Sequence, residues 1–235
     1  MTGKEVMREL ESLGNPQTKK TLLNHGAVEP FFGVRIGDMQ PMVKKIKKNY
    51  ELSLELFDTK NGDAQYLAGL IADEKKMTIE DLQLWVEHAC WHMVSEYAVA
   101  WIAAESNHGR IMANLWIQSS DEKIASAGWN TWASICTISL DDNLDKIELK
   151  KLLDLIEKNI HTSHNRVRYT MNNFLMACGQ CVGEMYEPTM KVAKRIGEVK
   201  VNVGNTACKV HYAAAYLQKM KDSGSLGKKK KKARC

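Results

Sequence analysis

Apolar residues recur every three or four positions along almost the whole chain, and this periodicity limits the possible folds more than any other feature. Val6, Leu10 and Leu13, for example, fall on one face of a helix. Strand-like alternation is nearly absent, and only four prolines occur in 235 residues. The sequence therefore predicts an all-α protein.

Turn and capping residues divide this pattern into about a dozen short helices. The first is expected from Thr2 to Gly14, and Pro16 suits the first turn of the second, which ends near Gly26. Thr78, three residues before Asp81, resembles a capping box. The other helices are expected after Gly37, at 52–57, after Asp63, and at about 91–104, 108–118, 121–136, 143–159, 165–181, 188–197 and 206–221.

Helix pairs recur about every 35 to 45 residues, which is typical of stacked helical hairpins. We therefore predict a right-handed α-α superhelix of HEAT-like hairpins, one domain spanning residues 1–220. A compact helical bundle is the alternative. In a superhelix, the side chains that line the concave face normally carry the function.

The net charge of +5 is unevenly distributed. Residues 219–235, which include the five lysines Lys228 to Lys232, carry +7, so the preceding residues carry −2. We expect residues 221–235 to form a flexible basic tail. Such a tail is either an arm for a polyanion, nucleic acid first, or an inert solvated segment.

Several classes of protein lack support in this sequence. It has no apolar run of 18 residues and no secretion signal, and its six cysteines fit reduced thiols, so we expect a cytoplasmic protein, and a monomer. Phosphate-binding glycine loops, HExxH and paired CxxC motifs are absent, and Cys178 with Cys181 is a lone CxxC. We expect neither a metal nor a nucleotide cofactor.

All six tryptophans lie between Trp85 and Trp132. We expect Trp85, Trp101 and Trp116 to be core residues. Trp91 is equally consistent with core and with a surface that stacks on a ligand; on a helix it shares a face with Ser95, while His92 and Glu96 form the adjacent pair. Trp129, beside Asn130, is a further stacking candidate.

Residues 164–174 open a later helix with Arg166, Arg168, Asn173 and Phe174. A basic, amide-rich helix start suits contacts to phosphates or base edges, because free backbone N–H groups favour anions there. The alternative is a capped helix with exposed arginines.

Three segments, taken with the helix pairs, carry a resemblance to a known family: Phe32–Arg35, Cys90–Ser95 and Arg168–Leu175. In order and spacing, the chain resembles the AlkD-like DNA alkylation repair proteins, which are HEAT-like-repeat alkylpurine DNA glycosylases, over most of residues 1–220. The resemblance implies a concave face that holds duplex DNA by its backbone. It also implies two tryptophans, an aspartate and an arginine around the damaged nucleotide, with the carboxylate stabilising an oxocarbenium-like sugar.

In this register, Trp91 matches the first tryptophan, whereas Ser95 stands at the aspartate, Ser126 at the arginine and Asn173 at the second tryptophan. The resemblance thus implies a divergent member whose base-excision activity is absent or altered. An active glycosylase using Glu96 is an alternative. One residue along a regular helix turns a side chain by about 100°, so Glu96 could reach the cleft only from an irregular helix.

The partner that the resemblance implies is alkylated or distorted duplex DNA. The residues expected to contact its backbone are Lys44, Lys48, Arg166, Arg168, Arg195 and Lys209. A protein-interaction scaffold is the other class of function, because the body of the chain is slightly acidic and helical repeats bind proteins as readily as DNA.

Overall fold

The computed structural model describes residues 1–234, and every regular element in that part of the chain is helical. Its α-helices are α1 (Gly3–Ser12), α2 (Pro16–Asn24), α3 (Ile36–Ile46), α4 (Tyr50–Asp58), α5 (Gly62–Ile71), α6 (Ile79–His88), α7 (Ala100–Glu105), α8 (Gly109–Trp116), α9 (Glu122–Ile138), α10 (Lys146–Asn159), α11 (Asn165–Cys181), α12 (Tyr186–Ile196) and α13 (Ala213–Asp222). A π-helix, η1 (Val94–Val99), precedes α7, and 3₁₀ turns occupy η2 (Asp141–Asn143) and η3 (Gly183–Met185).

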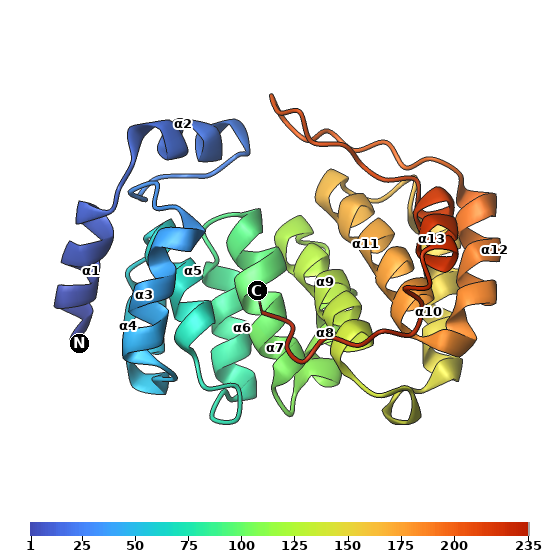
Figure 1. Cartoon of the computed structure of the whole chain (residues 1–235), viewed down its shortest axis with the longest axis horizontal. Coiled ribbons are helices and arrows are strands. Elements are labelled where there is room, and N and C mark those ends of the chain that lie inside the picture. Colours follow the sequence, from blue (N-terminus) through green and yellow to red (C-terminus); the bar gives the residue numbers. More distant parts are fainter. Residues whose placement is uncertain (235) are drawn as a thin grey trace.

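The helices run along the long axis of the molecule from α1 at one end to α12 at the other, with α11 between α9 and α10 (Figure 1). Helix α9 packs between α8 and α11, and it contributes buried residues to both hydrophobic clusters of the core. The two clusters are therefore parts of one domain. The predicted all-α, single-domain fold is confirmed.

Local capping explains where several helices begin. Thr2 and Glu5 form a capping box on α1, and Thr78 and Asp81 form the predicted one on α6. The side chain of Asn15 caps α2, whose first residue is Pro16. These short-range hydrogen bonds fix helix starts that the sequence alone already indicates.

The structure departs from the predicted elements in three places. The helix expected at 91–104 is divided into a π-helical turn and α7, and the helix expected at 143–159 begins only at Lys146, which Asp145 caps. The helix expected at 206–221 begins at Ala213. Residues 197–212 form instead an extended arm, with Gly197 and Gly204 at positive φ and a run of alternating valines, a composition that disfavours helix.

The arm runs from the end of α12 across α11 toward α2 (Figure 1). The backbone of Asn202 exchanges two hydrogen bonds with the side chain of Asn165 at the start of α11, at 2.8 and 2.7 Å. A Cβ atom on Gly204 would lie 2.8 Å from the carbonyl oxygen of Asn24. The arm therefore touches both α11 and the end of α2.

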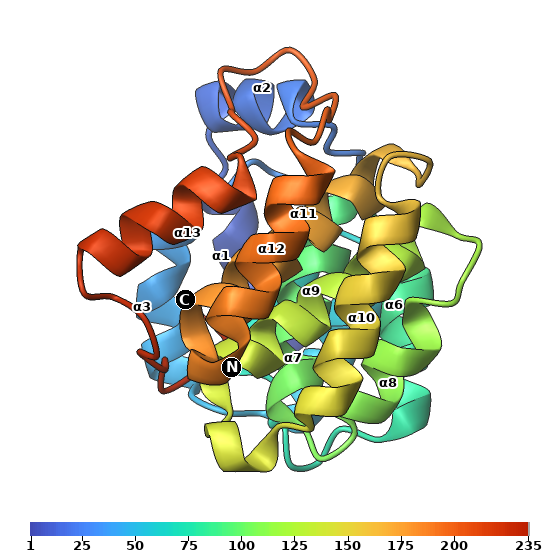
Figure 2. The same ribbon diagram turned by 90° about the vertical axis from the view of Figure 1, so that its right-hand side faces the viewer.

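The segment after α13 differs from the flexible tail expected from the sequence. Helix α13 packs against α11 and α12 (Figure 2) and continues past residue 220, the expected boundary. Residues 227–234 then lie against the body, where Arg234 is bound by Glu74 and Glu105. Composition does not show these carboxylates, which come from the turn after α5 and from the end of α7. Within residues 1–234, no helix is long and apolar enough to cross a membrane.

The close approach of α9 to α8 depends on Gly128. A Cβ atom there would lie 2.7 Å from the backbone nitrogen of Ile117 and 2.9 Å from Cβ of Trp116. We expect Gly128→Ala to lower the free energy of unfolding by about 1–3 kcal/mol, because the helices would have to separate. Urea denaturation would measure the change.

The matched control is Gly37→Ala in α3, because a Cβ atom there meets no heavy atom within 4 Å. This variant should keep the stability of the wild type or gain up to about 1 kcal/mol from helix propensity. Equal effects of the two substitutions would contradict the packing role of Gly128.

Candidate functional site

Four elements enclose a cleft of about 730 Å³: the end of α2, the π-helix η1, the start of α11 and the arm. Its walls are rich in aromatic rings, which come from η1, α7, α11 and the residues just before η1. These rings are Trp91, His92, Tyr97, Trp101 and Tyr169. Polar groups of Asn165 and Asn202 lie at its edge. The cleft thus combines flat apolar surfaces with hydrogen-bonding groups.

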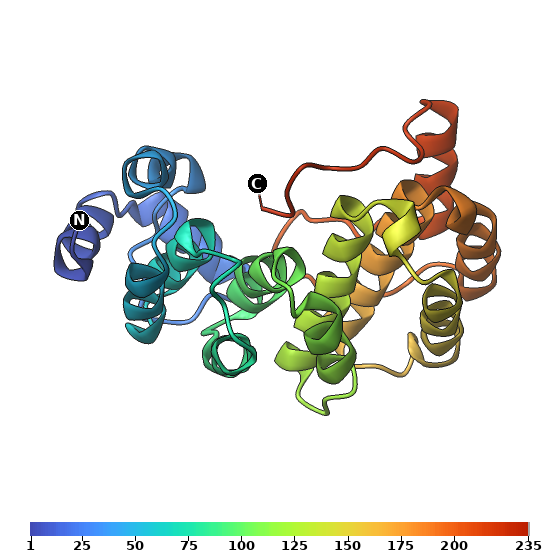
Figure 3. The ribbon, with the colours of Figure 1, turned by 90° about the horizontal axis from the view of Figure 1, so that it is seen from below.

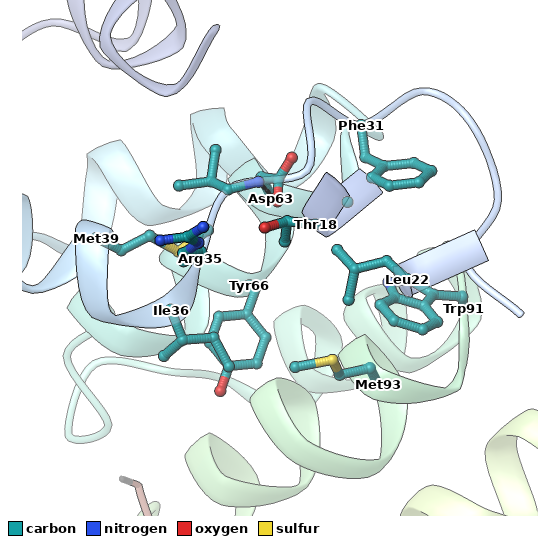
Figure 4. Close-up of a pocket in the computed structure, with 12 residues that line it drawn as sticks. Thr18, Leu22, Phe31, Arg35, Ile36, Met39, Asp63, Tyr66, Trp91 and Met93 are labelled. Atoms are coloured by element: carbon teal, nitrogen blue, oxygen red, sulfur yellow. Dashed lines mark hydrogen bonds between the residues drawn. The ribbon is translucent and has the colours of Figure 1, made fainter. Parts of the chain in front are cut away.

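Trp91 forms the wall between this cleft and a neighbouring apolar cavity of about 280 Å³. In Figure 4, Leu22, Met93 and Tyr66 gather with Trp91 around that cavity. Only 8% of Trp91 is exposed, so its ring is mostly a packing surface for α2 and η1.

The segment Phe32–Arg35 is held by a single buried carboxylate. Asp63 accepts hydrogen bonds from the backbone N–H groups of Phe32, Gly33 and Val34 at 2.6, 2.9 and 3.1 Å. Gly33 has a φ of 82°, and a Cβ atom there would lie 2.7 Å from the backbone of Lys19. This loop therefore fixes α2 against α5, and with it one wall of the cleft.

Behind the aromatic wall, Glu96 and Arg166 form a buried ion pair. Nε of Arg166 donates to Glu96 Oε1 at 2.8 Å, and Nη2 donates to Oε2. The Glu96 side chain has no exposed surface, and that of Arg166 is 18% exposed. Glu96 stands in the π-helix, so the irregular helix does occur, but its carboxylate is buried against Arg166 of α11.

Arg166 of this ion pair supports the ring of Tyr169 in the cleft. The guanidinium of Arg166 stacks on the ring of Tyr169 at 4.3 Å, while its backbone N–H donates to Glu122 at 2.6 Å. Tyr97 meets Trp101 edge to face at 5.6 Å. Burial, and then the neighbouring Tyr169, raise the pKa of Tyr97 above its ordinary value, so its hydroxyl stays protonated. Arg166, held by Glu96, is a positioning residue for the ring of Tyr169.

Two asparagines extend this polar layer along the concave face. Asn130 donates to the backbone oxygen of Glu96 at 2.9 Å, and Asn173 donates to Asn130 at 3.2 Å. Asn130 and Asn173 also line a second cavity, of about 460 Å³, beneath residues 228–233. An amide network thus lies where the resemblance implies the second tryptophan.

Comparison with known proteins agrees with this architecture. Residues 6–188 match the family described as DNA alkylation repair enzyme. The chain belongs to this family. It is 32% identical to an uncharacterized protein of Listeria monocytogenes and 31% identical to one of Listeria innocua, over 94% of this chain and 98% of each relative.

A solved structure is similar over the full length of both chains, with a TM-score of 0.93 and 40% sequence identity. It is described as a new family of proteins related to the HEAT-like repeat DNA glycosylases with affinity for branched DNA structures. The predicted family and the predicted HEAT-like superhelix are therefore confirmed.

Two of the four positions that the family resemblance singled out are buried serines. Ser95 and Ser126 are fully buried, and their hydroxyls donate to the backbone oxygens of His92 and Lys123. Trp129 and Phe174, expected to stack on DNA, pack on each other at 5.6 Å with 1% and 0% exposure. They are core residues, because α9 and α11 turn these faces toward each other.

Trp85 and Trp116 are core residues as expected, each 1% exposed. Trp101 also belongs to the core as expected, and its 9% exposed surface lines the cleft. The sequence did not indicate that Trp101, Tyr97 and Tyr169 line the cleft. The one signal that could have done so was the clustering of aromatic residues around Glu96 and Arg166.

The six cations expected to contact DNA do not form one row. Arg166 is committed to Glu96, Arg195 is paired with Glu157 of α10 at 2.7 Å, and Lys48 is paired with Glu74. Arg168 lies near Asn165 in α11. Lys44 on α3 and Lys209 on the arm are exposed. Within residues 1–234, no group of three or more His, Cys, Asp or Glu side chains could hold a metal ion.

His92 is the titratable group of the cleft whose pKa is most informative. Burial, and then the positive charge of Arg166, lower the pKa of His92 from 6.5 to about 4. The imidazole is therefore neutral at physiological pH. An unfolded chain would take up a proton at this histidine at a pH where the folded chain does not.

We expect the free energy of unfolding to fall as the pH drops from about 6.5 to about 5, because protonation of His92 favours the unfolded chain in that interval. His92→Gln should remove this part of the pH dependence. Urea denaturation at several pH values would measure it. The control is His88→Gln, which changes an exposed side chain of α6 and should keep the wild-type dependence of stability on pH. If His92→Gln showed the same pH dependence as His88→Gln, the role of His92 would be contradicted.

Proposed function

We propose that this protein binds branched DNA on its concave face, with the aromatic cleft receiving bases that are unstacked at the branch point, and that it does not excise bases. The observation that carries the proposal is the cleft itself, in which Tyr97, Trp101 and Tyr169 provide rings while no free carboxylate is available. The affinity for branched DNA described for the similar solved structure supports it.

Stacking explains why a branch would be preferred to a continuous duplex. A branch point exposes the faces of terminal bases, which a duplex keeps covered. Each base stacked on an aromatic side chain contributes about 1–3 kcal/mol, largely independent of sequence. Asn165 and Asn202 at the edge of the cleft can add hydrogen bonds to base edges or to the sugar-phosphate backbone.

Base excision is disfavoured by the state of the acidic groups. Loss of an alkylated purine builds positive charge on the sugar, so an unpaired carboxylate must lie close to it. Ser95 is uncharged and buried, and the carboxylate of Glu96 is already neutralised by Arg166. Neither residue offers a free negative charge to a bound nucleotide.

The lesion, the oligomeric state and the compartment stay predictions. Alkylated or distorted duplex DNA as a ligand, a monomer and a cytoplasmic location rest on the sequence alone. The same holds for the alternative of a protein-interaction scaffold.

The first test compares binding to a four-way junction with binding to a linear duplex of the same length and composition, by fluorescence anisotropy. We expect the wild type to prefer the junction. Tyr169→Leu should weaken junction binding about tenfold or more, because a stacking surface is lost, and should change duplex binding little.

Tyr50→Leu is the matched control, since it removes the same ring from α4, outside the cleft. It should bind the junction as the wild type does. Equal wild-type affinity for junction and duplex, or equal effects of the two tyrosine substitutions, would contradict the proposal.

The second test measures base excision directly. Incubation with duplex DNA that contains 7-methylguanine or 3-methyladenine should release no base above background. Release that disappears in Glu96→Gln but persists in Ser95→Ala would instead establish the alternative, an active glycosylase that uses Glu96.

A further inference from the structure

Residues 227–234, here named the lysine strap, cross the concave side of the molecule after α13. Figure 3 shows this segment running from α13 toward the middle of the superhelix. Its backbone N–H groups at Gly227 and Lys230 donate to the carbonyl oxygens of Gln180 in α11 and Thr137 in α9, at 2.7 and 2.8 Å. The strap therefore lies along the carboxyl ends of these two helices.

Arg234 fastens the far end of the strap. Its guanidinium donates to Glu105 at 2.9 and 2.7 Å, to Glu74 at 2.7 Å and to the carbonyl oxygen of Ala72 at 3.0 Å. The backbone N–H groups of Ala233 and Arg234 also donate to Glu105. Only 6% of the Arg234 side chain is exposed, so this contact is a built site for an arginine and not a surface encounter.

The strap reverses the charge of the edge that it covers. Without it, that edge would present Asp141, Glu105 and Glu74 together with the carbonyl ends of helices, all of which repel phosphate. In the strap, Lys229 pairs with Asp141 at 2.8 Å, and Arg234 pairs with the two glutamates. The acidic groups are thereby neutralised.

Four lysines of the strap are not needed to neutralise these acidic groups. Lys228, Lys230, Lys231 and Lys232 are exposed, and none has an ion-pair partner within the described part of the chain. Lys232 also shares a cavity of about 370 Å³ with Lys47 and Lys48, at the loop that follows α3. The row of cations thus continues from the strap onto the body.

We propose that the lysine strap is a phosphate-binding rail along which one arm of the DNA lies, and that Glu105 and Arg234 are the latch that holds it in place. The proposal rests on the function proposed above and adds a second contact surface, at the other end of α9 and α11 from the cleft. A fixed row of cations loses less conformational freedom on binding than a free tail does, so the latch should determine affinity.

Two single substitutions separate a rail from a flexible tail. Arg234→Ala and Lys232→Ala each remove one positive charge, but only the first opens the latch. Dissociation constants of the full chain for a four-way junction would be measured by anisotropy between 50 and 200 mM salt. Lys232→Ala should lower the salt dependence by about one phosphate contact. Arg234 is held by carboxylates and makes no phosphate contact of its own. Arg234→Ala should lose about tenfold more affinity than Lys232→Ala.

For Glu105→Ala, a rail and a flexible tail predict opposite changes in DNA affinity. It removes a negative charge, so a flexible tail would bind DNA as tightly as before or more tightly. A rail would bind more weakly, because the latch is lost. Circular dichroism and thermal melting would show whether each variant is folded. If Arg234→Ala does not fold, the binding of Glu105→Ala decides between a rail and a flexible tail.

The rail would be overturned if Arg234→Ala and Lys232→Ala lost the same affinity for the junction. It would also be overturned if Glu105→Ala bound the junction at least as tightly as the wild type. Tighter binding by both latch variants would show that the strap covers the concave face instead. A wild type that does not distinguish junction from duplex would contradict the proposed function alone, since the latch variants can then be compared on duplex DNA. A wild type without DNA affinity would overturn both.

Discussion

The buried ion pair between Glu96 and Arg166 is the interaction on which the concave face depends. It joins the π-helix in the first half of the chain to α11 in the second half, residues that are 70 positions apart. Breaking such a pair typically costs about 3–5 kcal/mol, because one charge would stay buried without a partner. Through Tyr169, which stacks on Arg166, the same pair sets one wall of the cleft.

Helix length then fixes the distance between the cleft and the lysine strap. Helices α9 and α11 each have 17 residues, so each spans roughly 25 Å. Asn165 at the start of α11 lies at the cleft, and Gln180 near its end holds the strap. Lys229 of the strap donates to the carbonyl oxygen of Cys136 near the end of α9, where the helix dipole is negative.

The π-helix explains how a family scaffold can keep an acidic residue and still lack a free carboxylate. Serine stands at the position where the resemblance implies an aspartate, and the adjacent Glu96 is turned into the core. There it binds Arg166, and the cleft beside this ion pair is lined by aromatic rings.

Neighbouring residues were sufficient to predict the helical periodicity, the capping box of Thr78 and Asp81, the core positions of Trp85 and Trp116, and the family. Long-range packing determines that Trp129 and Phe174 face each other, that Trp101 lines the cleft, that Arg166 binds Glu96 instead of facing solvent, and that Arg234 holds a lysine-rich segment in place. Periodicity and caps arise from contacts within about four residues of the chain, whereas these side chains find partners between 35 and 165 positions away, where the packing of helices places them.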